Sequence, residues 1–319
     1  MPRTALILGA NGRFGRHVAQ ALQRHGWHVR PFDRSKDTLP DAAIGADLIV
    51  NAWNPPYSKW ATEVPRLTAS VIEAAKTSGA AVMIPGNIYV YGTDLPPILS
   101  PETPHRATHP LGKIRREMER AYREAGVKTI ILRAGDFIDT EASGNWFDRV
   151  IATKIASGKI TYPGPVDVPH AWAFLPNLAA AAAGLAARLD DLPVFSDLTF
   201  DGFTMTGVDL AEALGRVVGK PVRAKPMNWL PIRIARPFWA EAKHLLEMRY
   251  LWQRPHRIDG QVLRNLLPDL RATPLDDALR QACAPLIQNE TSTQTSRWAD
   301  AAETSSTSGP SEGQSTPAP

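Results

Sequence analysis

The sequence contains one cysteine, Cys283, among its 319 residues. A single cysteine excludes a disulfide framework and a thiolate metal cluster within one chain, so we expect a reducing, cytoplasmic setting. Long apolar runs are also missing. The N-terminal run is too short for a signal peptide, and the apolar run 178–189 has 12 residues, short of the roughly 20 that span a membrane. We therefore predict a soluble protein.

Neither sign of charge dominates, because the net charge is only +4. Residues 288–319 carry four acidic side chains and one basic side chain, so the basic excess lies in the rest of the chain. A modest basic excess favours an anionic ligand. The basic residues between 113 and 123 alternate with glutamates at helical spacing, which is typical of a solvated helix face. We expect no nucleic-acid partner.

The first half of the chain alternates strand-like and helix-like segments. The pattern predicts strands at 4–8, 27–32, 47–52, 80–84 and 128–133, and helices at 16–25, 59–78 and 113–125. Such alternation predicts an α/β fold with a doubly wound parallel sheet. Beyond residue 137 the pattern loosens, with helices expected at 146–156, 175–187, 208–218, 238–253 and 274–286, a strand at 198–203 and an extended segment at 220–225.

A glycine-rich segment, Gly9-Ala10-Asn11-Gly12-Arg13-Phe14-Gly15, follows the first predicted strand and opens a helix. Its glycines let the backbone turn tightly and approach a pyrophosphate, whose charge the helix N-terminus stabilises. Asp33 ends the next predicted strand, where a carboxylate can accept hydrogen bonds from the adenosine ribose. This arrangement predicts NAD or NADP binding, and a tight turn without a ligand is the plainer alternative.

The choice between NAD and NADP stays open on the sequence. The Asp33 carboxylate favours NAD because it repels a 2′-phosphate, whereas Arg13, Arg34 and Lys36 lie nearby and could hold that phosphate. We divide the chain into an NAD(P)-binding Rossmann domain over 1–160, a smaller substrate-binding α/β portion over 161–287 and a tail over 288–319. That tail has 13 Ser and Thr residues and no apolar periodicity, so we expect it to be disordered.

The Gly-x-x-Gly-x-x-Gly spacing resembles that of the extended and atypical short-chain dehydrogenases/reductases, including the NAD-dependent epimerase/dehydratase family. The resemblance spans most of residues 4–286. It is carried by Asn51-Ala52 at a strand end, Glu73-Ala74-Ala75-Lys76, Asn87-Ile88-Tyr89-Val90-Tyr91-Gly92, Glu102-Thr103-Pro104, Ile131-Leu132-Arg133-Ala134-Gly135 and Gly202-Phe203-Thr204-Met205-Thr206. It implies an NAD(P)-dependent oxidoreductase or epimerase/dehydratase-like enzyme that acts on a hydroxyl or carbonyl of a small polar substrate, with a sugar nucleotide as one candidate.

In that family a tyrosine moves the proton, a lysine four residues later holds the nicotinamide ribose, and a serine or threonine positions the substrate. No tyrosine of this chain has a lysine four residues after it. The resemblance implies Lys113 as the lysine, which puts His109 at the tyrosine position and Asn87 at the serine position. His109 could carry the proton, and an exposed loop histidine is the equal alternative. Candidate replacement acids are Tyr57, Tyr89 and Tyr91, each with core packing as its alternative.

These expectations define the candidate site. The candidate catalytic residues are Lys113, His109, Asn87 and Tyr91. The candidate cofactor-binding residues are Gly9, Asn11, Gly12, Arg13, Phe14, Gly15, Asp33, Arg34, Ala52 and Lys113. The residues expected to close over the substrate, with core packing as the competing account, are Trp53, Asn54, Trp146, His170 and Trp172. We expect no metal site.

Two further alternatives remain. The missing Tyr-x-x-x-Lys motif favours a non-catalytic NAD(P)-binding sensor or assembly protein, and a homodimer is left open as the assembly. Aromatic and basic residues mix over 229–253, where closing the substrate pocket is the favoured role and peripheral membrane contact the weaker one.

Overall fold

The computed structural model describes residues 2–287 and is organised around a six-stranded sheet of order β10-β6-β4-β3-β1-β2. Its strands are β1 (Thr4–Leu8), β2 (His28–Pro31), β3 (Leu48–Asn51), β4 (Ala81–Gly86), β6 (Thr129–Arg133) and β10 (Phe195–Thr199). All neighbouring strands run parallel. The chain passes from β1 outward to β2 and then crosses to β3 on the other side of β1, so the strand order reverses there. The predicted doubly wound parallel sheet is confirmed.

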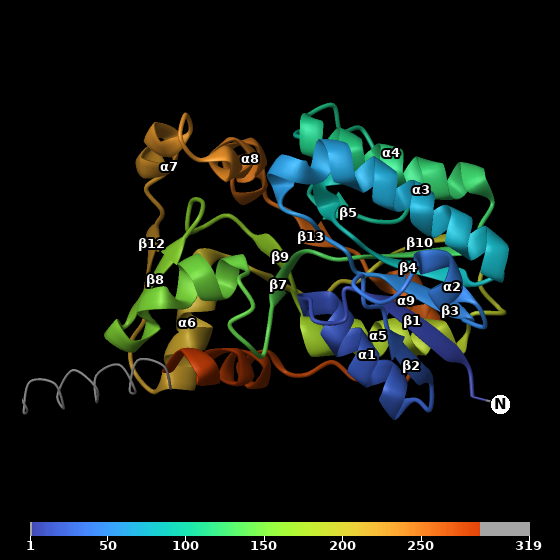
Figure 1. Cartoon of the computed structure of the whole chain (residues 1–319). Coiled ribbons are helices and arrows are strands. Elements are labelled where there is room, and N and C mark those ends of the chain that lie inside the picture. Colours follow the sequence, from blue (N-terminus) through green and yellow to red (C-terminus); the bar gives the residue numbers. More distant parts are fainter. Residues whose placement is uncertain (1, 288–319) are drawn as a thin grey trace, which may run out of the picture.

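Alternating side chains of the strands bury both faces of this sheet. Ala5 and Ile7 of β1 pack in the core formed with α1 (Arg13–Arg24) and α5 (Leu175–Ala187). Leu6 and Leu8 point to the opposite core, formed with α2 (Leu39–Ala43), α3 (Trp60–Ser78) and α4 (Pro110–Ala125). In Figure 1, α3 and α4 lie above the sheet and α1 and α5 lie below it. Burial on both faces explains why the strands are continuous apolar runs.

A smaller set of strands and helices lies beside the large sheet, on the left of Figure 1, around a core of its own. Its three-stranded sheet contains β7 (Asp136–Ile138), β9 (His170–Phe174) and β11 (Phe203–Met205), and β8 (Lys159–Tyr162) pairs with β12 (Arg223–Pro226). Its helices include α6 (Gly207–Val218), α7 (Leu230–Ala235), α8 (Ala240–Met248) and a helix over residues 275–287. The remaining short elements are β5 (Ile98–Leu99) paired with β13 (Arg257–Ile258), and α9 (Gln261–Leu266).

Several expected elements differ in the structure. The strand expected at 198–203 is two strands, because Gly202 adopts a φ of 40° and turns the chain between β10 and β11. A Cβ on Gly202 would lie 2.0 Å from the carbonyl oxygen of Trp172, so only glycine fits this turn. The helix expected at 146–156 is a π-helical turn, Phe147–Ile151, followed by a 3-10 helix, Ala152–Ser157.

The predicted helix at 238–253 is divided as well, into α8 and the 3-10 helix Arg249–Trp252. The strand that ends at Asn51 is the third along the chain. Because α5 and β10 both belong to the layers of the large sheet, residues on each side of position 160 build it, and the domain boundary stays a prediction. The expected tail, 288–319, lies outside the described residues. Within residues 2–287, no helix is both long and apolar enough to cross a membrane.

Candidate active site

A cavity of about 1150 Å³ lies where the order of the parallel strands reverses. Its lining includes the residues that directly follow or end the strands: Gly9 after β1, Ala52 after β3, Gly86 at the end of β4 and Ala134 after β6. Ligands of doubly wound sheets bind in this crevice at the carboxyl ends of the strands. The cavity is therefore the candidate active site.

The glycine-rich loop forms one end of the cavity, which Gly9, Asn11, Gly12, Arg13 and Phe14 line. Gly9 has a φ of 82°, and its carbonyl oxygen accepts a hydrogen bond of 2.9 Å from the Gly12 N–H. A Cβ on residue 15 would lie only 2.2 Å from that oxygen, so Gly15 lets α1 start directly above the turn.

The N-terminus of α1 has no side-chain cap and no acidic residue in its first turn. The first N–H groups of the helix, together with the positive end of its dipole, are therefore available to an anion in the cavity. The Arg13 guanidinium is held beside this end, since Nε donates to the Ser143 carbonyl (2.9 Å) and Nη2 to the Gly144 carbonyl (2.6 Å).

The two residues that follow β2 have different surroundings. Asp33 Oδ1 accepts hydrogen bonds from the Ser35 hydroxyl (2.7 Å) and the Ser35 N–H (2.9 Å), and Oδ2 lies 3.2 Å from the Lys36 ammonium. These partners lower the pKa of Asp33 to about 2. Asp33 is not part of the cavity wall, whereas Arg34 is, with its guanidinium 4.2 Å from the centre of the Trp53 ring.

Helix α4 presents Arg115 to the cavity instead of Lys113. The helix begins at Pro110, three residues earlier than expected, and Leu111, Arg115 and Glu119 lie on its buried face. The Lys113 side chain is 56% exposed, lies 3.8 Å from Glu117 and takes no part in the cavity wall. The residue one turn before Arg115 is Leu111, which is buried and has no proton to exchange.

Arg115 is 8% exposed, yet no carboxylate within residues 2–287 lies close enough to form an ion pair with it. Nη2 donates to Asn54 Oδ1 (3.1 Å), the guanidinium stacks 4.4 Å from the Trp60 ring, and Nε has no hydrogen-bond partner among the described residues. Burial lowers the pKa of Arg115, and the nearby Glu119 charge opposes this shift. Arg115 lines the cavity, so an anionic or hydroxyl-bearing ligand there would approach its charge through the terminal nitrogens of the guanidinium, because Nε itself is enclosed by protein.

His109 is the N-cap of α4 and is not brought to the cavity. Its Nδ1 lies 3.0 Å from Glu247 Oε1, and its Nε2 lies 3.1 Å from the Tyr250 hydroxyl. The same Glu247 oxygen accepts a hydrogen bond of 2.7 Å from the Leu111 N–H. His109 therefore joins the start of α4 to α8 and the segment after it, and its proposed role as a proton carrier gains no support from its position.

Two tyrosines meet in the cavity wall. The hydroxyl oxygens of Tyr57, in the 3-10 helix Tyr57–Lys59, and Tyr89, in the 3-10 helix Ile88–Tyr91, are 2.7 Å apart. Burial raises the pKa of each phenol, so both are neutral proton donors at physiological pH. Asn87 also lines the cavity, and its Oδ1 accepts from the Tyr89 N–H (3.1 Å).

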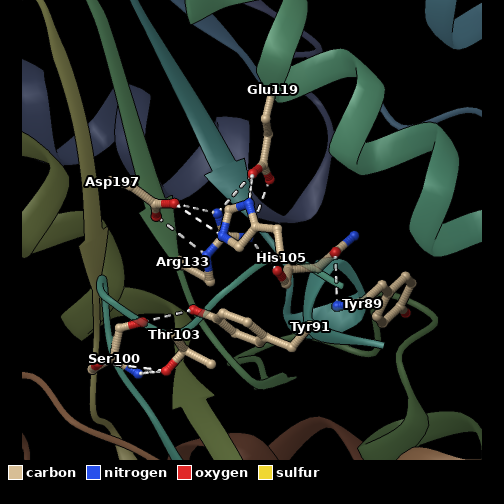
Figure 2. Close-up of polar contacts among 9 residues, drawn as sticks. Tyr89, Tyr91, Ser100, Thr103, His105, Glu119, Arg133 and Asp197 are labelled. Carbon is tan, nitrogen blue, oxygen red and sulfur yellow. Dashed lines mark hydrogen bonds and ion pairs between the residues drawn. The ribbon is translucent and has the colours of Figure 1, made fainter. Parts of the chain in front are cut away.

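Tyr91 points away from the cavity, and Figure 2 shows its surroundings. Its hydroxyl donates to the Ser100 carbonyl (3.2 Å), and its ring packs against His105. Burial raises the pKa of this phenol as well. Tyr91 is thus a packing residue in the structure, which was the alternative weighed for it from the sequence.

Beside Tyr91 lies a buried charge cluster that sequence reasoning missed. The Arg133 guanidinium donates to Glu119 (2.8 Å) and to Asp197 (2.7 Å), and His105 lies 3.5 and 3.4 Å from the same two carboxylates (Figure 2). Although His105, Glu119 and Asp197 are close enough to share a metal ion, the Arg133 guanidinium already forms an ion pair with both carboxylates. Arg133 Nη1 also donates to the Asn87 carbonyl (2.5 Å) and so fixes the backbone beside the cavity.

An acidic side chain that sequence reasoning also missed, Asp136, lines the cavity from β7. His170 lies behind it, with Nε2 2.7 Å from Asp136 Oδ2 and its ring stacked 4.0 Å from Trp252. His170 and Trp172 are buried in β9 and do not form the cavity wall, whereas Trp53, Asn54 and Trp146 do.

Comparisons with solved structures support the fold. MoeE5, solved with UDP-glucose and NAD, is 14% identical, with a TM-score of 0.69 over 90% of this chain and 99% of its own. A variant UDP-glucuronic acid 4-epimerase from Bacillus cereus, solved with UDP-4-deoxy-4-fluoro-glucuronic acid and NAD, is 15% identical, with a TM-score of 0.69 over 89% and 99%. A nucleoside-diphosphate-sugar epimerase from Pseudomonas aeruginosa is 16% identical, with a TM-score of 0.66 over 90% and 98%.

At these identities the likeness establishes a shared fold, and the Rossmann-type fold expected from the sequence motifs is confirmed. No protein-family model matches the sequence, and a search of curated proteins finds no match.

Proposed function

We propose that this chain binds NAD or NADP and is an oxidoreductase or epimerase/dehydratase-like enzyme that acts on a hydroxyl or carbonyl carbon. The observation that carries the proposal is the uncapped N-terminus of α1, which opens through the glycine loop into the 1150 Å³ cavity. Structural neighbours solved with NAD, MoeE5 and the Bacillus cereus epimerase, support the same cofactor.

The residues present fit a dinucleotide. Gly9, Gly12 and Gly15 remove the side chains that would fill the turn, so a pyrophosphate can reach the first N–H groups of α1. Arg34 lies in the loop three residues after β2, where the adenosine ribose of such a cofactor is expected, and Ala52 lines the cavity after β3. When bound, the nicotinamide donates or accepts hydride at a substrate carbon.

We assign the proton to the Tyr57–Tyr89 pair. One hydroxyl donates to the other across 2.7 Å, which leaves the second O–H free to donate into the cavity. The Arg115 guanidinium lowers the pKa of Tyr57, whereas burial and the Asp136 carboxylate each raise it by more, so the phenol stays protonated. Asn87 can donate to a substrate oxygen from its side-chain amide.

A second candidate function, non-catalytic NAD(P) binding, is favoured by one observation. The cavity face of α4 carries Leu111 and Arg115, so a proton-transferring tyrosine and a lysine are both missing from it. In that case the Tyr57–Tyr89 pair would only close the wall of the cavity.

Two measurements test the proposal. Calorimetric titration with NAD⁺, NADH, NADP⁺ and NADPH should detect at least one saturable complex, and four blank titrations would refute both candidate functions. Phe substitutions at Tyr57 and Tyr89 should then preserve binding and lower carbonyl reduction, followed at the nicotinamide absorbance band, by roughly 10²- to 10⁴-fold. Tyr91→Phe, which removes a buried hydroxyl outside the cavity, is the matched control and should keep full activity.

A further inference from the structure

The cavity wall that comes from the C-terminal third of the chain is apolar. Its members after residue 226 are Met227, Ile232, Trp239, Glu241, Leu245 and Leu251, with no lysine, arginine or histidine among them. The π-helical turn and its neighbours add Trp146 and Val150. Trp239 also reaches solvent, since 45% of it is exposed, so the apolar wall extends to the mouth of the cavity.

The acidic side chains of this part of the cavity oppose an anionic substrate. Glu241 is fixed in place, because its Oε1 accepts a hydrogen bond of 3.1 Å from the Ser58 N–H. Asp136 lines the cavity from β7. A substrate diphosphate placed here would meet carboxylates and apolar side chains instead of cationic donors, and this costs free energy.

The six basic side chains of the cavity wall, Arg13, Arg16, Arg34, Lys59, Arg115 and Arg149, all come from outside the segment 227–251. Arg13 holds the Ser143 and Gly144 carbonyls, Arg16 pairs with Asp139, and Lys59 lies 3.8 Å from Glu63. The Arg149 side chain lies close to that of Arg13, because both approach Gly144: Arg13 Nη2 and Arg149 Cδ are 3.4 and 3.5 Å from the position of a Cβ built on this glycine. Arg13, Arg16 and Arg149 therefore lie at the end of the cavity formed by the N-terminus of α1, where the diphosphate of the dinucleotide is proposed to bind.

We propose that the substrate is an uncharged, largely apolar carbonyl compound that binds against Trp146, Ile232, Trp239 and Leu245, and that it is not a sugar nucleotide. The proposal rests on the proposed NAD(P)-dependent function and differs from the small polar substrate expected from the sequence. The carbonyl carbon accepts hydride from the reduced dinucleotide, its oxygen takes a proton from the Tyr57–Tyr89 pair, and the proton is replaced from solvent. The carbonyl is reduced to an alcohol as the dinucleotide is oxidised.

The test uses the full chain saturated with NADH or NADPH, after its binding has been shown by calorimetry. Benzylacetone serves as the uncharged probe and UDP-glucose as the sugar nucleotide, with tryptophan fluorescence and nicotinamide absorbance as readouts. We expect saturable binding and slow reduction of benzylacetone, and no saturable binding of UDP-glucose. Trp239→Ala should weaken benzylacetone binding roughly ten- to hundredfold, the loss expected for one buried aromatic contact, and Trp239→Phe should restore most of it.

The matched control is Phe238→Ala, which removes an aromatic side chain that is 93% exposed and takes no part in the cavity wall. It should leave benzylacetone affinity unchanged. Saturable UDP-glucose binding, or no benzylacetone binding by a chain that does bind the dinucleotide, would overturn the proposal while the proposed cofactor stands. A chain that binds no dinucleotide fails at the earlier step, so the two failures are distinguishable.

Discussion

Replacing Arg115 by methionine tests most directly whether the cavity binds the dinucleotide. Arg115 is buried and lines the cavity, and its Nη2 donates to Asn54, another residue of the cavity wall. We expect it to donate to the bound dinucleotide or substrate. A hydrogen bond from a charged group contributes about 1.5–3 kcal/mol, so Arg115→Met should raise the Kd of NADH or NADPH roughly ten- to 150-fold.

The same substitution should leave the ligand-free protein folded. No carboxylate among residues 2–287 pairs with the buried charge of Arg115, which makes that charge costly, and methionine keeps much of the volume of the side chain. The losses are the hydrogen bond to Asn54 and the stacking on Trp60, each on the order of 1 kcal/mol. We therefore expect the melting temperature to change by only a few degrees, so that weaker binding reports on the site and not on unfolding.

The control comes from the same helix. Lys113→Met removes an exposed cation whose pairing with Glu117, at 3.8 Å, contributes at most about 1 kcal/mol to stability. Calorimetry at fixed salt should show a Kd within about twofold of the unsubstituted chain. Arg115→Lys should fall between, since it keeps the charge and loses the planar fork. If Lys113→Met weakens binding while Arg115→Met does not, then α4 presents its other face to the ligand, and the assignment of Arg115 to the binding site is wrong.

Three further predictions address the cofactor and the pH dependence of stability. Gly12→Asp should abolish dinucleotide binding, because its charge repels the pyrophosphate, and lower the melting temperature by only a few degrees, because the N-cap preference of aspartate offsets the 3.1 Å approach of its Cβ to the Gly9 carbonyl oxygen; unchanged affinity would show that no phosphate binds there. Arg34→Ala should lower the affinity for NADPH relative to NADH about tenfold, and Asp33→Ser should shift the ratio the other way; a constant ratio would show that neither side chain meets the ribose. Burial lowers the pKa of His256 from 6.5 to about 3, so the stability from its neutral form is complete above pH 6.5 and is lost as the pH falls toward 3. At pH 5 this loss is about 2 kcal/mol, and urea unfolding at pH 7 and 5 should show that His256→Asn avoids it.

The sequence pattern predicts most of the large sheet because each element carries a local signal. The bounds expected for β1 and α5, residues 4–8 and 175–187, are those of the structure. Continuous apolar runs indicate strands buried on both faces, and glycine marks helix ends, as Gly79 and Gly126 do with positive φ. The smaller part is less predictable, because features such as the turn at Gly202 depend on the close approach of a distant strand.

The site was harder to predict, for two different reasons. The start of α4 could have been predicted from the sequence, because Pro110 is a typical first-turn residue. A helix that begins there places residues 111 and 115 on one face. The contact between Tyr57 and Tyr89 could not have been predicted from the sequence. The two residues are 32 positions apart and meet only because the loop after β3 packs on the segment after β4. The contacts of Asp33 with Ser35 and Lys36 are local in the sequence. Their meaning for the choice of cofactor depends on the structure, in which Arg34 lines the cavity and Asp33 does not.

The cavity face of α4 carries an arginine, Arg115, instead of the lysine that the family resemblance implies, and this difference has a chemical consequence. A lysine beside a tyrosine can lose its own proton and thereby tune the phenol across neutral pH, whereas an arginine remains charged throughout that range. Under the proposed function the proton comes from the Tyr57–Tyr89 pair, whose raised pKa values keep both phenols protonated. A neutral phenol can donate its proton to the more basic alkoxide that forms in carbonyl reduction, whereas alcohol oxidation would first require the pair to lose a proton. Reduction should then stay nearly constant between pH 6 and 9, and a rate that falls as the pH rises through about 6.5 would instead assign the proton to a histidine.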